Sequence, residues 1–80
     1  MIVYPNPIVF GRDIHLQTEG DWKNMELRLC TVMGRDIMKG HQDFQDATPE
    51  ILRLPELPTG MYLLHLSHGK QMLTKKILIQ

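Results

Sequence analysis

Apolar and polar residues alternate with a period of two in several segments of this chain, which is typical of half-buried β-strands. The alternation is clearest in residues 13–18, 25–31 and 50–54, whereas residues 2–4, 61–66 and 72–79 are more continuously apolar strand segments. Gly and Pro residues separate these segments, and none of them sustains the i, i+3, i+4 spacing of an amphipathic helix. Residues 35–39 add a short strand after Gly34. The pattern therefore predicts an all-β fold, an immunoglobulin-like antiparallel β-sandwich of about seven strands.

The same pattern predicts how the segments are oriented and connected. In residues 25–31, the odd-numbered side chains share one face of the strand and the even-numbered ones share the other. Residues 40–48 are polar apart from Phe44 and predict the longest loop. Residues 67–70 predict a four-residue hairpin turn, from which residues 72–79 run back antiparallel to residues 61–66.

Length and charge limit the classes of function. The 80 residues predict one small domain over residues 1–80, and a single cysteine excludes an intrachain disulfide. Nine basic and nine acidic side chains cancel, which argues against a nucleic-acid partner. No apolar run approaches the roughly 18 residues of a membrane-spanning helix.

Residues that could perform catalysis or bind a metal are few and scattered. Cys30 lies in the middle of a strand with no base beside it in the sequence, so it is expected to be a small, half-buried apolar residue. His65 and His68 are three residues apart, which is too sparse for a zinc site. Asp43 and Asp46 offer oxygen ligands for calcium but lack the acidic density of a calcium loop. The sequence therefore predicts no enzyme, no cofactor and no metal site.

Motifs near the two ends of the chain each allow a structural and a recognition interpretation. Pro5-Asn6-Pro7 removes two backbone donors and favours a rigid turn, which would blunt an edge strand. Gly34 and Gly60 suit backbone angles that other residues avoid. These residues serve folding, recognition by a partner, or both.

Two further motif features follow the same logic. Tyr62 fits a core aromatic residue whose hydroxyl reaches the surface. Lys75 and Lys76 are adjacent on a strand, so their side chains point to opposite faces. Charge at this position protects an edge strand from aggregation or contacts a partner, and the sequence favours neither.

Taken in order, the motifs resemble a known family. The motifs that carry the resemblance are Pro5-Asn6-Pro7, a central strand that leads to Gly34-Arg35, a Leu-Pro-Thr-Gly-Met-Tyr segment at residues 57–62, and a closing Lys-Lys-Ile-Leu-Ile-Gln segment at residues 75–80. They are similar to the C-terminal sorting domain of type A cargo of the type IX secretion system (Por secretion system) of Bacteroidota. The resemblance covers nearly the whole chain. The recognition residues that it implies are Pro5, Asn6, Pro7, Gly34, Gly60, Tyr62, Lys75, Lys76, Ile77 and Ile79.

The resemblance implies a non-enzymatic export signal. Such a domain follows an N-terminal cargo domain, directs the cargo from the periplasm across the outer membrane through the type IX translocon components, and is then cleaved off by a sortase-like surface peptidase. The cargo is expected at the cell surface or outside the cell. The alternative is an immunoglobulin-like binding or spacer module of a surface protein.

The two ends of the chain carry expectations of their own. Met1 is followed at once by strand and turn residues, so a secretion signal is expected upstream, in a longer protein. The final segment is long and apolar, and it follows a short turn. That arrangement favours exchange of a strand between copies, so the isolated domain is expected to form a strand-exchanged homodimer.

Overall fold

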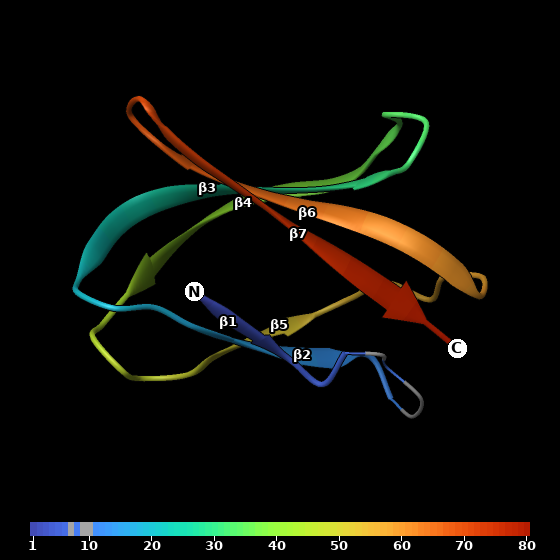
Figure 1. Cartoon of the computed structure of the whole chain (residues 1–80), viewed down its shortest axis with the longest axis horizontal. Helices are drawn as coiled ribbons and strands as arrows, with labels where there is room; N and C mark the ends of the chain where they lie inside the picture. Colours follow the sequence, from blue (N-terminus) through green and yellow to red (C-terminus); the bar gives the residue numbers. More distant parts are fainter. Residues whose placement is uncertain (7, 9–10) are drawn as a thin grey trace.

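A computed structural model describes residues 1–6, 8 and 11–80 of the chain, and seven β-strands in these residues form two layers (Figure 1). The strands are β1 (Ile2–Tyr4), β2 (Asp13–Gln17), β3 (Trp22–Thr31), β4 (Asp36–Phe44), β5 (Glu50–Arg53), β6 (Gly60–His68) and β7 (Gln71–Ile79). The predicted all-β fold is therefore confirmed.

The strands are distributed unequally between the two layers. One sheet has three strands in the order β1-β2-β5, and the other has four in the order β4-β3-β6-β7. All pairings between these strands are antiparallel. An immunoglobulin constant-type sandwich likewise places its first, second and fifth strands in one sheet and its third, sixth and seventh in the other. Here β4 joins the larger sheet.

The core lies between the two sheets and follows the alternation of the sequence. On β3 the odd-numbered face turns inward, since Met25, Leu27 and Leu29 are all buried, while Thr31 is partly buried. Burial of such side chains stabilises the fold by about 1.5–3 kcal/mol each. The core cluster comprises Ile8, Ile14, Leu16, Met25, Leu27, Leu29, Phe44, Leu54, Tyr62, Leu64, Leu66 and Ile77.

Two boundaries differ from the prediction. The expected loop over residues 40–48 is wrong in its first half, because β4 continues to Phe44, which pairs with Trp22. An edge strand with one side facing solvent tolerates polar residues, so polarity alone does not identify a loop. The second hairpin turn is tighter than expected. His68 still pairs with Gln71, and only residues 69 and 70 form the turn.

Each sheet has two edge strands, β1 and β5 in one and β4 and β7 in the other. Within the described part of the chain, no helix has the length and hydropathy needed to cross a membrane. Four of the predicted recognition residues, Lys75, Lys76, Ile77 and Ile79, lie on the edge strand β7.

Candidate recognition surface

The sequence motifs converge on one end of the four-stranded sheet. In this antiparallel sheet, β3 and β7 end where β4 and β6 begin. Thr31 pairs with Tyr62, which in turn pairs with Ile77 on β7. Figure 1 shows the turn between β3 and β4, the start of β6 and the C-terminus at the same, right-hand end of the molecule.

Asn6 ties the start of the chain to its last strand. Its side-chain Nδ2 donates to the carbonyl oxygen of Lys76 at 2.8 Å, and its Oδ1 accepts from the backbone N–H of Leu78 at 3.1 Å. The amide thus bonds to the backbone on both sides of Ile77, as the peptide group of a neighbouring strand would. We call this pair of bonds the Asn6 bracket. Pro5 is exposed beside it, and Pro7 lies outside the described residues.

Ile8 continues this pairing and was not among the predicted site residues. Its backbone N–H donates to the carbonyl oxygen of Leu78 at 2.8 Å, and its carbonyl accepts from the N–H of Gln80 at 2.9 Å. These bonds form a parallel bridge between Ile8 and Ile79. The signal in the sequence was an apolar residue directly after a proline turn, and the Ile8 side chain is 2% exposed in the core. The first segment therefore leaves β1 in one sheet and reaches the edge of the other.

Tyr62 anchors the segment that leads into β6. Its ring is part of the core, and its hydroxyl donates to the carbonyl oxygen of Pro58 at 2.7 Å. A tyrosine near the start of the sixth strand that bonds back to the upstream backbone is the tyrosine corner of immunoglobulin-like sandwiches. The predicted core position of the ring is confirmed, and the hydroxyl bonds to the backbone in a partly buried position.

The two motif glycines, Gly34 and Gly60, differ in backbone conformation. Gly34 has a φ of +89°, and no atom lies within 4 Å of the position that a Cβ would take. Its requirement is therefore backbone conformation and not space. The turn is closed by Thr31, whose carbonyl accepts from Gly34 N and whose Oγ1 accepts from Arg35 N. Gly60 pairs with Ile79, and its φ of +157° lies close to the extended region.

The closing strand separates its predicted recognition residues by face. Ile77 is fully buried, and Ile79 packs against the core from the same face. Lys75 shares this face and is half-buried, whereas Lys76 is exposed on the other, as the alternation predicts. Among the described residues, no carboxylate lies within 4.0 Å of either ammonium group. Both charges are thus available to a partner.

The cysteine that could have served catalysis is buried, and three of the four histidines contact neighbouring side chains of the fold. Cys30 is a free thiol and is 2% exposed, so it is more deeply buried than the expected half-buried position. His65 Nδ1 lies 2.8 Å from Thr74 Oγ1, and the His68 ring meets the edge of Trp22 at a centroid distance of 5.4 Å. His15 stacks on Tyr4.

The carboxylates considered for calcium hold backbone groups. Asp43 Oδ1 accepts from Asn24 N at 2.7 Å, and Asp46 Oδ1 accepts from Gly20 N at 2.6 Å. They therefore tie the turns at the start of β3 to the end of β4 and its loop. Within the residues that the structure describes, no three His, Cys, Asp or Glu side chains gather as a metal site would require.

A comparison with family models gives one match that spans the whole of this arrangement. The model is described as a secretion system C-terminal sorting domain, and it matches residues 2–80. No curated protein and no solved structure matches the chain. The matched range includes all four motifs and both sheets. It favours the export signal over the spacer module, and the family is not a catalytic one.

Proposed function

Since this chain belongs to the family of secretion system C-terminal sorting domains, we propose that it marks a type A cargo for the outer-membrane translocon of the type IX secretion system. As a sorting domain of this system, it interacts with the secretion machinery and is part of a secreted protein. In the proposal, an N-terminal cargo domain precedes residues 1–80, and both leave the periplasm together. A sortase-like surface peptidase then removes the sorting domain at the cell surface.

The observation that supports this proposal is the convergence of the motifs on one end of the four-stranded sheet. Asn6 joins the first segment to β7, and Tyr62 pairs with Ile77 at the same end. A partner that contacts this end meets both terminal segments at once. Folding and recognition are thereby coupled, because an unfolded chain would not present the segments together.

The predicted recognition residues divide into two roles within this proposal. Tyr62, Ile77 and Ile79 hold the shape of the surface from inside. Pro5 and Lys76 are exposed, and we assign direct contact with the machinery to such side chains. The strand-exchanged homodimer stays a prediction.

A fusion experiment tests the proposal. Residues 1–80, preceded by a short linker, are attached to an unrelated periplasmic reporter and expressed in a host with a type IX secretion system. We expect the reporter at the cell surface or in the medium. A matched fusion that lacks residues 75–80 should stay in the periplasm, as should the complete fusion in a host without the translocon. Retention of the complete, folded fusion in the competent host would contradict the proposal.

A further inference from the structure

The outer edge of β7 is covered in one half and open in the other. Lys76, Leu78 and Gln80 direct backbone groups outward, where Asn6 and Ile8 bond to them. Alternate residues of a strand turn their backbone groups to the same edge. Met72 and Thr74 therefore direct their N–H and C=O groups outward too.

These two residues have no backbone partner on that side among residues 1–6, 8 and 11–80. The Thr74 hydroxyl contacts His65 on the neighbouring strand, which leaves its backbone groups free. The open stretch begins after the turn at residues 69 and 70 and ends at the Asn6 amide. Unpaired edge groups of this kind accept an added strand.

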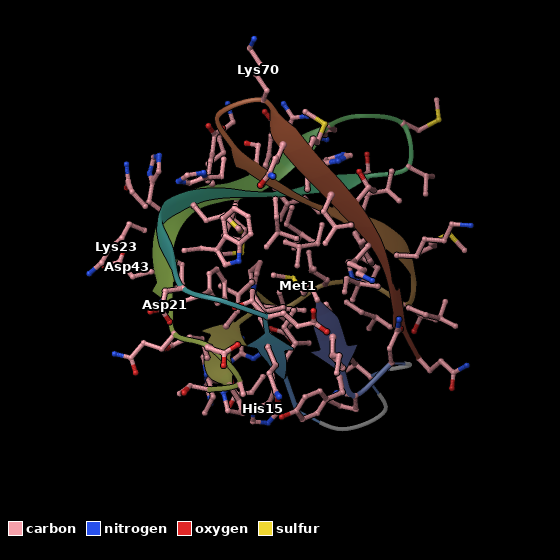
Figure 2. All side chains as sticks on the ribbon, turned by 60° about the vertical axis from the view of Figure 1, so that its left-hand side comes forward. Met1, His15, Asp21, Lys23, Asp43 and Lys70 are labelled. Carbon is pink, nitrogen blue, oxygen red and sulfur yellow. The ribbon has the colours of Figure 1, made fainter. Side chains whose placement is uncertain are left out.

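A groove with both apolar and polar lining residues runs beside the open stretch. It has a volume of about 390 Å³, and its apolar lining comes from Met1, Trp22, Met25, Leu66, Met72 and Leu73. Figure 2 shows Met1 in the middle of the molecule, beneath the hairpin of β6 and β7, whereas Lys70 extends from the tip of the hairpin into solvent. Side chains of an added strand alternate between two faces, so one set would enter this groove.

The positive charge of the turn between β6 and β7 and of β7 itself restricts the charge of a partner strand. Residues 69–80 contain three lysines and no acidic residue, although the whole chain is neutral. Lys70 and Lys76 are both exposed and flank the open stretch on either side. Glu19, from the connection between β2 and β3, is the acidic residue in the groove lining, so it disfavours an acidic partner side chain inside the groove. An incoming strand therefore complements this edge when its acidic side chains lie at its ends, beside Lys70 and Lys76.

A second copy of the chain fits less well. In the antiparallel register that pairs Met72 of one copy with Thr74 of the other, Lys70 faces Lys76 of the second copy. Like charges directly opposite each other destabilise a strand pair. The charge pattern therefore favours a different chain over self-association.

We propose that residues 72–74 form a docking edge for an extended segment of the secretion machinery, with an apolar side chain for the groove and acidic residues flanking it. This inference rests on the proposed function. Backbone bonds to Met72 and Thr74 supply affinity, and the groove and lysines supply selectivity. The Asn6 bracket limits the added strand to the upstream half of β7.

Two variants of the reporter fusion test the docking edge. Met72→Pro removes the outward N–H but leaves the bonds between β6 and β7, because proline is tolerated on an edge where its nitrogen faces solvent. Met72→Ala shortens the groove side chain and keeps the N–H, so it separates the side-chain contribution from that of the backbone bond. Lys70→Glu combined with Lys76→Glu reverses the flanking charge without altering the backbone, and Lys23→Glu is its control. Thermal melts of the isolated domains establish which variants fold.

We expect Met72→Pro and the double charge reversal each to lower export about tenfold, Met72→Ala to lower it less, and Lys23→Glu to be exported like the parent. Normal export of either folded test variant would overturn the docking edge, and if Met72→Pro does not fold, the charge reversal decides alone. Light scattering adds a second criterion: a parent dimer that Met72→Pro converts to monomer would assign the edge to a second copy instead. Failure of the parent fusion to leave the periplasm would instead contradict the proposed function.

Discussion

The side-chain oxygen of Asn6 accepts a hydrogen bond from the backbone N–H of Leu78, 72 residues further along the chain. Because the amide nitrogen also donates to Lys76, the side chain replaces one peptide group of a β-ladder. Ile8 continues the ladder with two backbone bonds. The first turn and the last strand therefore form one structural unit, and damage to either should weaken the other.

Truncation of Asn6 tests this unit. Asn6→Ala removes both side-chain bonds and leaves the Lys76 carbonyl and the Leu78 N–H to water. We expect the free energy of unfolding to fall by about 1 kcal/mol, the net value of hydrogen bonds that solvent can partly replace. Urea denaturation measures the change. Gln45→Ala, at an exposed loop position, is the control and should stay within about 0.5 kcal/mol of the parent. Equal stability of Asn6→Ala and the parent would refute the structural role of the bracket.

The tyrosine corner gives a second prediction. Tyr62→Phe keeps the buried ring but removes the bond to the Pro58 carbonyl. We expect a loss of about 0.5–1.5 kcal/mol, because the hydroxyl sits in a partly buried position. Tyr4→Phe is the matched control, since Tyr4 is 38% exposed and stacks on His15 through its ring. Urea denaturation of both variants should separate them, and similar losses in the two would count against a special role for the corner.

Backbone strain at Gly34 gives a third prediction. Gly34→Ala forces a Cβ onto a residue with a φ of +89°, so we expect a loss of about 1–3 kcal/mol even though the space is open. Gly40→Ala is the control, because Gly40 also has open space for a Cβ but has no positive φ. Thermal melts of the isolated domains measure both effects.

Export of the same two variants separates folding from recognition. If Gly34 serves conformation alone, export of the Gly34→Ala fusion falls only as far as the folded fraction falls. A variant that melts like the parent and still stays in the periplasm would assign Gly34 to direct recognition.

Much of this fold follows from alternation. Ile14 and Leu16 on β2, and Tyr62, Leu64 and Leu66 on β6, are buried where the period of two places them. Polar residues 40–43 conceal the second half of β4, because an edge strand needs no apolar side chain on its solvent face. Local pattern cannot tell such a strand from a loop, and only its pairing with β3 identifies it.

The site was less accessible to sequence reasoning than the fold. The motif at residues 5–7 marked a turn, but the bracket that Asn6 forms joins residues 70 and 72 positions apart. No period or spacing encodes contacts at that separation. The sequence does not predict the open half of β7 for the same reason. The apolar closing segment predicts one uniform strand, and only the contacts of Asn6 and Ile8 show which part of its edge is covered.

The two closing lysines give the last prediction. Lys76 is exposed and Lys75 is half-buried, so replacing both with alanine removes charge at little cost to the core. Under recognition by charge, export of the double variant falls while its melting temperature stays within a few degrees of the parent. Lys23→Ala, at an exposed position on β3, controls for loss of positive charge as such. Under edge protection, export is kept, but the isolated variant self-associates at lower concentration in light scattering, because lysine on an edge opposes pairing with other strands. We expect the loss of export, since both ammonium groups lack a carboxylate partner within the described residues and are free to meet one on the machinery.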